Sequence, residues 1–296
     1  MKKLAGMILL CALILGMLSG CERRGASGSA RSSRSATTPT AETENSGRRS
    51  LTRREILEAR NAGIPETTAP TQGGSSSQGG GGFYTDERVP HYNAANPRWE
   101  RLRFDWKSKD RGESLSIEVP VDGAMYAYYR DLERYYNPEN FFHYVNDANN
   151  EALVDEVVQQ IMHSSTLFSH NSSALVRELA NFVQEVVTYQ YDVDTTGEEE
   201  YPRYPIETLY ERQGDCEDTS ILMAALLKAY GYEVGFIHLP GHLAVALRSS
   251  DDYSDGPYVQ MDGHRYLYIE STSAGWNIGD IPDEVMGEPA YVYLIP

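Results

Sequence analysis

The chain has 296 residues, with 26 basic and 43 acidic side chains and a formal net charge of −17. Its 21 Tyr, 7 Phe and 3 Trp all lie in residues 83–296, so this part can bury a hydrophobic core and the preceding segment cannot. Residues 83–296 carry 15 basic against 37 acidic groups, and phosphate binding needs clustered Lys and Arg, which excludes nucleic acid as a partner of the globular part.

Residues 1–21 have the pattern of an export signal. Two lysines precede an apolar run over residues 4–18, and small residues lead into Cys21. The pattern resembles the lipobox of bacterial lipoproteins, which implies cleavage before Cys21 and lipid on its thiol. We therefore expect a cell-envelope protein that is anchored to the membrane by lipid and faces away from the cytoplasm. Because Glu22 and not Asp follows the cysteine, the expected membrane is the outer one if the host has one. An uncleaved anchor is the alternative, since about 17 apolar residues are near the minimum for a membrane span.

Residues 22–82 contain ten Gly, ten Ser and eight Thr and no aromatic residue. This composition predicts a disordered tether, and a coil of about 60 residues has an end-to-end distance of about 40 Å.

Residues 83–170 are expected to form an extension of the folded core and not an independent domain. Alternation predicts an edge strand over residues 114–119, and apolar residues recur at helical spacing over residues 125–136 and 154–161.

Cys216 is expected to be the only free thiol of the exported chain, because Cys11 leaves with the signal and Cys21 carries lipid. A lone thiol in an exported protein is a buried bystander, a site of intermolecular pairing or a nucleophile.

The residues around Cys216 predict a helix with both ends marked. Asp215 and Asp218 form a capping box at the start, and Gly231 supplies the exit after an apolar run. A helix N-terminus lowers a thiol pKa, whereas the neighbouring acids, Glu217 included, raise it. A cationic partner is therefore needed, and a histidine is the natural one.

Of the seven histidines, His242 has the setting that this chemistry requires. Strands are predicted over residues 234–239, 242–247 and 265–270, so that His242 opens the second strand and Glu270 ends the third. A helix start and two strand ends can converge on one point. The competitor, His238, lies between two apolar residues, which favours a structural role.

The order of these motifs resembles the transglutaminase-like superfamily of cysteine enzymes, in particular its prokaryotic branch. The similarity runs from about residue 182 to residue 281 and rests on Gly214-Asp215-Cys216-Glu217-Asp218, Pro240-Gly241-His242-Leu243 and Glu270-Ser271-Thr272, with Gly275-Trp276 behind. It implies an α+β, papain-like core over residues 171–296, with the nucleophile helix packed on an antiparallel sheet. It also implies Cys216 as nucleophile, His242 as general base and Glu270 as orienting residue, although many family members have Asp at the third position.

This set of residues supports acyl transfer at an amide of a protein or peptide substrate, through a thioester on the cysteine. Water as acceptor gives hydrolysis and an amine gives crosslinking. The residues do not distinguish hydrolysis from crosslinking, and we expect a peptidase or amidase in preference to a crosslinking enzyme.

Three further residues have two interpretations each. Gln184, on a predicted amphipathic helix, is either an oxyanion donor beside the Cys216 backbone N–H or a solvent-facing residue. Trp276 either lines the cleft or fills the core, and Thr272 either ends the strand or bonds the Glu270 carboxylate.

Two alternatives to an enzyme stay open. One is a binding or scaffolding lipoprotein that keeps the fold without turnover. The other is a metal site made by Cys216, His242 and Glu270, but closely spaced ligand pairs are absent from the sequence, so no metal and no cofactor are expected.

Overall fold

The computed structural model describes residues 92–134, 136–249, 258–261 and 263–296. The predicted signal peptide at residues 1–21, the lipidation site Cys21 and the predicted tether at residues 22–82 lie outside the described residues. Within the described part of the chain, no helix has the length and apolar character needed to cross a membrane.

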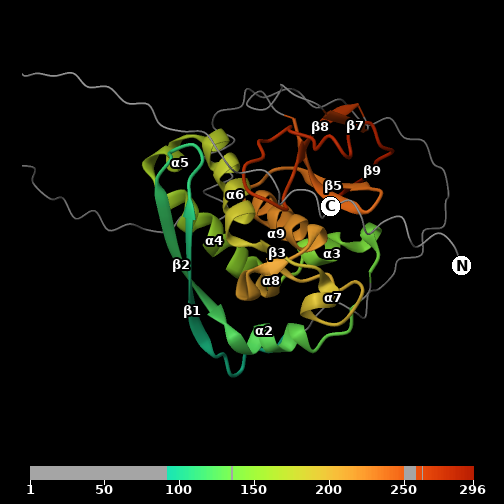
Figure 1. Ribbon diagram of the computed structural model, residues 1–296. Coiled ribbons are helices and arrows are strands. Elements are labelled where there is room, and N and C mark those ends of the chain that lie inside the picture. The colour runs from blue at the N-terminus through green and yellow to red at the C-terminus, as the bar shows by residue number, and fades with distance from the viewer. Residues whose placement is uncertain (1–91, 135, 250–257, 262) are drawn as a thin grey trace, which may run out of the picture. The chain divides into compact units, whose positions relative to one another are not determined.

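Helices dominate the first two thirds of the described chain, and strands dominate the rest (Figure 1). The strands are β1 (Trp99–Lys107), β2 (Ser114–Asp122), β3 (Thr188–Tyr189), β4 (Gln213–Gly214), β5 (Val234–Leu239), β6 (His242–Arg248), β7 (Tyr258–Met261), β8 (His264–Ile269) and β9 (Tyr291–Leu294). The helices are α2 (Gly123–Arg130), the 3₁₀ helix η1 (Pro138–Asn140), α3 (Phe142–Val145), α4 (Glu151–His163), α5 (Thr166–His170), α6 (Ser172–Val186), α7 (Asp192–Thr195), α8 (Pro205–Glu211) and α9 (Cys216–Ala229).

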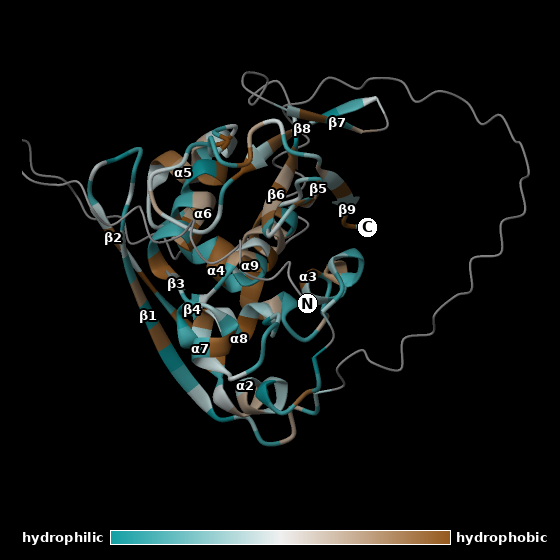
Figure 2. Cartoon of the chain, turned by 45° about the vertical axis from the view of Figure 1, so that its right-hand side comes forward, coloured by the Kyte–Doolittle hydropathy of each residue, from teal (hydrophilic) through white to brown (hydrophobic). Residues whose placement is uncertain are grey.

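The main sheet has five antiparallel strands in the order β7-β8-β6-β5-β9. Its central strand β6 carries five consecutive buried residues and is tan to brown in Figure 2. Side chains alternate between the two faces of a strand. Val245 and Leu247 therefore join the main core, whereas Ala244 and Ala246 join a second apolar cluster on the other face. Both faces of β6 are covered, which explains why its sequence is apolar without interruption.

Helix α9 lies between the sheet and the other helices. It packs against β5 and β6 on one side and against α4 and α6 on the other (Figure 1). Its residues 219–227 are all buried because they contact neighbours all round. The predicted α+β class, with the nucleophile helix packed on an antiparallel sheet, is confirmed.

The hairpin β1–β2 covers α4 and α6 on the far side from the sheet (Figure 1). Phe104 and Trp106 point inward from β1, and both rings meet Phe182 of α6 edge-on, with centroids 5.5 and 5.1 Å away. One hydrophobic core runs from these rings through α9 to the sheet, as expected if residues 83–170 are an extension of the core. The boundary after residue 170 stays a prediction.

A buried glutamate fastens the hairpin to α6. Glu178 accepts hydrogen bonds from Trp106 Nε1 and from Ser108 Oγ, both at 2.6 Å, and from Asn181 Nδ2 at 3.2 Å. Its side chain is almost completely buried, so these donors take the place of water.

The predicted strands over residues 114–119, 234–239, 242–247 and 265–270 are confirmed as β2, β5, β6 and β8, and the helix over residues 154–161 is confirmed as part of α4.

The helix predicted over residues 125–136 is too long, because α2 ends at Arg130. The backbone N–H groups of Asp131 and Leu132 close the last turn on the carbonyls of Tyr128 and Tyr129, and the Arg134 guanidinium folds back to donate to the carbonyls of Tyr129 and Leu132 as well. The pattern search also missed β1, whose outward positions carry charged residues, and the edge strands β7 and β9.

Replacing Glu178 by Ala should lower the free energy of unfolding by about 2 to 4 kcal/mol, because buried donors on the hairpin and on α6 lose their acceptor. Urea unfolding followed by circular dichroism measures the loss. The matched control is Glu185→Ala on the exposed side of α6, which should change stability by less than about 0.5 kcal/mol. Equal losses in both variants would show that Glu178 does not fasten the hairpin.

Candidate active site

Cys216 is the first residue of α9, and its side chain is half-buried. The predicted capping box is present: the Asp215 carboxylate accepts from the Asp218 backbone N–H, and the Asp218 carboxylate accepts from the Asp215 N–H. Gly231 has a φ of 92° after the last turn, which confirms the predicted exit. Gly214 is also required, since a Cβ there would lie 2.5 Å from the Asp218 side chain.

His242 and Glu270 meet where β6 begins and β8 has just ended. The His242 Nε2 atom lies 2.9 Å from Glu270 Oε2, so the ring uses Nε2 for this bond and leaves Nδ1 unbonded to Glu270. The Glu270 side chain is 2% exposed and that of His242 is 19% exposed. The predicted convergence of these two strand ends is therefore present.

Several donors surround the Glu270 carboxylate. Tyr268 donates its hydroxyl to Oε2 at 2.8 Å, and Thr272 donates its hydroxyl to Oε1 at 2.7 Å. The backbone N–H groups of Ser271 and Thr272 also donate to Oε1. Of the two interpretations of Thr272, the structure supports the bond to the carboxylate.

These donors keep Glu270 ionised. Burial by itself would raise the pKa of this carboxyl, but the hydrogen bond and charge of His242 and the bonds from Thr272 outweigh burial and bring the pKa to about 2. A carboxylate that stays charged can hold an imidazolium at any pH above that value.

The Cys216 thiol bonds an acid in this structure. Its Sγ lies 3.4 Å from Glu217 Oε2 and donates to it, and among the described residues it makes no hydrogen bond to His242. Burial raises the pKa of the thiol well above its ordinary value, and the neighbouring acids Glu217 and Asp215 raise it further. The backbone N–H of Leu243, the residue after His242, bonds the sulfur and acts in the opposite direction, which places the thiol beside the start of β6.

A single buried arginine balances part of the acid excess around Cys216. Arg203 is fully buried, and its Nη1 lies 2.5 Å from both Asp192 Oδ1 and Asp218 Oδ2. It also bonds Glu211 at 3.1 Å and Thr195 at 2.7 Å. Burial nevertheless raises the pKa of Asp192 to about 6, aided by the nearby charge of Asp215.

The oxygen atoms of these acids are close enough together to hold a cation. Among the described residues, three overlapping sets place their ligand atoms within 4.8 Å of one another: Asp215, Cys216 and Glu217; Asp192, Asp215 and Asp218; and Asp192, Glu200 and Glu217. Arg203 already occupies the second set. None of the three includes His242 or Glu270, so the alternative metal site of Cys216, His242 and Glu270 finds no support.

Gln184 contacts the backbone of Glu270, and Trp276 lines a groove whose lining residues do not include Cys216, His242 or Glu270. Gln184 is 5% exposed, so the solvent-facing interpretation is wrong. Its Nε2 donates to the Glu270 carbonyl at 2.7 Å, and its Oε1 is buried without a partner. Trp276 is half-buried, bonds Ser273 and lines a small groove with Lys109 and Arg177. Roles as oxyanion donor and cleft wall stay predictions.

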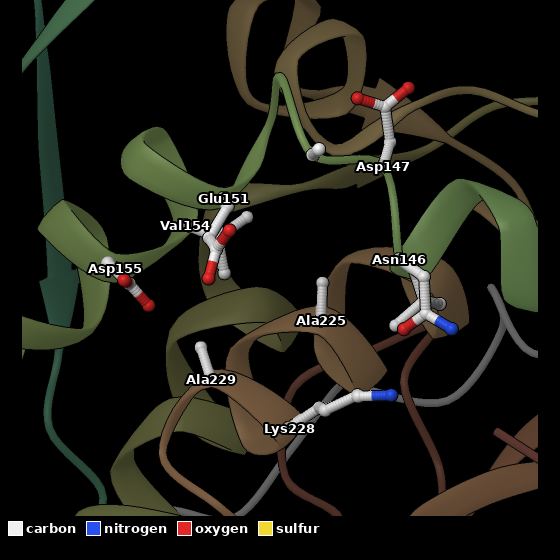
Figure 3. Close-up of a pocket in the computed structure, with 10 residues that line it drawn as sticks. Asn146, Asp147, Glu151, Val154, Asp155, Ala225, Lys228 and Ala229 are labelled. Atoms are coloured by element: carbon white, nitrogen blue, oxygen red, sulfur yellow. The ribbon is translucent and has the colours of Figure 1, made fainter. Parts of the chain in front are cut away.

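A larger cavity, of about 130 Å³, lies at the opposite end of α9 (Figure 3). Glu151, Val154 and Asp155 of α4 face Lys228 and Ala229 in the last turn of α9. Because a helix rises about 1.5 Å per residue, this cavity is about 20 Å from Cys216 and does not belong to the site.

Sequence reasoning missed two residues of the site. Tyr268 lies two positions before Glu270 on the same face of β8, which is a signal that strand periodicity could have supplied. Arg203 lies in the segment before α8, where no local pattern indicates that its guanidinium reaches acids on α7 and α9.

The depressed pKa of Glu270 predicts a pH dependence of stability. Its folded-state pKa of about 2 is below the ordinary value of 4.5, so the stabilisation is complete above about pH 4.5 and is lost as the pH falls to about 2. Glu270→Gln should lower the free energy of unfolding by about 3 kcal/mol at pH 7 and by much less near pH 2. Urea unfolding of both proteins across this range measures the difference, and a difference that does not depend on pH would contradict the assignment.

The comparisons with known proteins found a family model and solved structures that resemble parts of this chain. A family model described as the transglutaminase-like superfamily matches residues 158–271, a range that includes Cys216, His242 and Glu270. No curated protein matches the chain. Two chains of solved structures match, among them Legionella pneumophila LapG in calcium-bound form, with 14% identity, coverage of 47% of this chain and 87% of that chain, and a TM-score of 0.28. Residues 158–271 are therefore a transglutaminase-like domain.

Proposed function

We propose that this protein is a lipid-anchored cysteine enzyme that acts on amide bonds of a protein or peptide, with hydrolysis preferred over crosslinking. Cys216 is the nucleophile, His242 the general base and Glu270 the residue that orients the imidazole. The observation that carries the proposal is the buried pair of His242 and Glu270, fixed at two strand ends beside the first residue of α9. A nucleophile, a base and an orienting acid are the three parts that acyl transfer needs.

The tautomer of His242 sets the order of proton transfers. Because Nε2 bonds Glu270, Nδ1 is the nitrogen that takes the proton when the thiol turns away from Glu217. The Cys216 sulfur then attacks the amide carbonyl carbon, and the imidazolium gives this proton to the leaving amine, so that a thioester remains. Water next loses a proton to His242 as its oxygen attacks the thioester, which releases the acid and restores the thiol.

Two groups are candidates to stabilise the oxyanion of the tetrahedral intermediate. The Cys216 backbone N–H lies in the first turn of α9, where a helix has no internal acceptor for it. The Gln184 amide uses one hydrogen for the Glu270 carbonyl and has a second one to donate. Both groups would act as fixed donors that need no reorganisation during the reaction.

The proposal includes lipid on Cys21 and a location in the cell envelope, facing away from the cytoplasm and at the outer membrane if the host has one. The pattern of residues 1–21 supports the anchor, and the composition of residues 22–82 supports a tether that lets the domain reach substrates at a distance from the membrane.

A second candidate function is a binding lipoprotein without turnover. One observation favours it: the thiol bonds Glu217 and not His242, and acids raise its pKa. The reactivity of Cys216 separates the two functions.

The first test is the rate of iodoacetamide alkylation of Cys216 as a function of pH, read by mass spectrometry of the tryptic peptide 213–228, which contains no other cysteine. His242→Ala removes the imidazolium and should thereby raise the pKa of the thiol. Alkylation at pH 6 should slow by about tenfold for each pKa unit of that rise. Glu217→Gln should change the rate at pH 6 little, because burial and the neighbouring Asp215 raise the pKa of Glu217 to about 11 and its side chain is already uncharged at that pH.

Glu185→Gln on the exposed side of α6 is the matched control and should leave the rate unchanged. Slow alkylation that rises only near the pKa of an ordinary thiol, together with no effect of His242→Ala, would overturn the enzyme proposal in favour of the binding lipoprotein.

A further inference from the structure

Strand β3 has an open edge beside the nucleophile. The N–H of Thr188 donates to the Arg212 carbonyl at 2.9 Å, and the N–H of Gln190 donates to the Gly214 carbonyl at 3.0 Å. Because the backbone groups of successive residues in a strand point to opposite edges, the N–H and C=O of Tyr189 point away from β4. No hydrogen bond within the described part of the chain uses either group. This edge can therefore accept a further strand.

The side chains along this edge are apolar and partly exposed. Tyr189, Tyr191 and Val193 occupy every second position and are 38%, 46% and 56% exposed, and the two tyrosine rings meet edge-on with centroids 5.5 Å apart. Between the last two of them, Asp192 is buried and paired with Arg203, which fixes the segment to the scaffold. We call Tyr189, Tyr191 and Val193 the apolar ledge. Exposed apolar side chains that stand together mark a binding surface.

The apolar ledge adjoins the Cys216 thiol. Tyr189 pairs with Gly214, two residues before Cys216. Burial raises the pKa of the Tyr189 hydroxyl, and Cys216 is close enough to raise it further. A peptide whose bond Cys216 attacks must lie against the residues around the sulfur. The occupant of the ledge is therefore the substrate and not an unrelated partner.

We propose that the peptide substrate binds in an extended conformation as an antiparallel strand on the open edge of β3, with an aromatic or large aliphatic side chain on the apolar ledge. This inference rests on the proposed function and names its substrate class. The substrate residue opposite Tyr189 exchanges two backbone hydrogen bonds with it. The side chain of that residue lies beside the Tyr189 ring, because residues directly opposite each other in a sheet share a face. Two residues of a strand span about 7 Å, so the attacked bond lies within about two residues of this one.

The test measures how fast peptidyl chloromethyl ketones alkylate Cys216 in the full chain, read by mass spectrometry of the peptide 213–228. The acetyl-Phe-Gly and acetyl-Gly-Phe reagents place an aromatic side chain at one of two positions, and the acetyl-Gly-Gly reagent has none. Each rate is divided by the rate with free 2-mercaptoethanol, which removes the intrinsic reactivity of the reagent. At least one Phe reagent should exceed the Gly-Gly reagent by about fivefold or more, because its ring packs on the apolar ledge.

An ester analogue of the faster Phe reagent tests the backbone pairing. In this analogue an oxygen atom replaces the backbone N–H of Phe. It should react about three- to tenfold more slowly than the amide, because the Tyr189 carbonyl loses its donor while the side chain is unchanged.

Matched variants locate the ring contact. Tyr189→Ala should lower the ratio of the Phe rate to the Gly-Gly rate by about threefold or more. Trp99→Ala also removes an exposed ring, 67% exposed on β1 and outside the apolar ledge, and should leave this ratio unchanged. A ratio taken within one variant cancels any change in the reactivity of the thiol, and circular dichroism shows whether each variant is folded.

Three outcomes would overturn the inference: equal normalised rates for the three peptide reagents, an ester that reacts as fast as the amide, or equal effects of the two variants. Self-association that Tyr189→Ala abolishes, measured by sedimentation, would instead assign the edge to a second copy of this chain. The proposed function fails separately, when iodoacetamide alkylation does not depend on His242, because that measurement involves no peptide. A Phe preference in such a protein would support the apolar ledge as a peptide-binding surface and would overturn only the enzyme.

Discussion

The charge of Glu270 is the constraint on which the rest of the site depends. A carboxylate that is 2% exposed must replace its water with donors, and the chain supplies Tyr268, Ser271 and Thr272 together with the His242 ring. Each donor comes from β8, from its end or from the neighbouring strand β6, so the sheet holds the carboxylate in one place. The imidazole is in turn fixed by its Nε2 atom, which decides which nitrogen can exchange a proton with the thiol.

At the start of α9, in contrast, acidic side chains outnumber basic ones. Arg203 neutralises Asp192 and Asp218 and thereby holds the capping box of α9 against α7. Burial and the neighbouring Asp215 raise the pKa of Glu217 to about 11, and this side chain accepts the hydrogen of the Cys216 thiol. The acids that pair with Arg203 belong to the scaffold, whereas Glu217 contacts the nucleophile.

The elements of the core could be predicted from sequence because their signals are local. The helix after Asp215 has a capping box and a glycine exit within 17 residues, and β5, β6 and β8 are short apolar runs between turn residues. The meeting of His242 with Glu270 was predictable from strand ends alone. The bond from Cys216 to Glu217 could not be predicted, because the sequence does not determine which of two acceptors the thiol rotamer faces. The contacts of Arg203 could not be predicted either, because its partners lie on three separate helices.

The most direct test of the central claim is ¹⁵N NMR of the imidazole nitrogens of His242, assigned by comparison with a His242→Gln variant and recorded where the ring is neutral. If Glu270 orients the ring as the structure shows, the proton resides on Nε2 and Nδ1 is unprotonated. In Glu270→Gln this preference should weaken. A proton on Nδ1 in the unaltered protein would leave no base facing the thiol and would contradict the account.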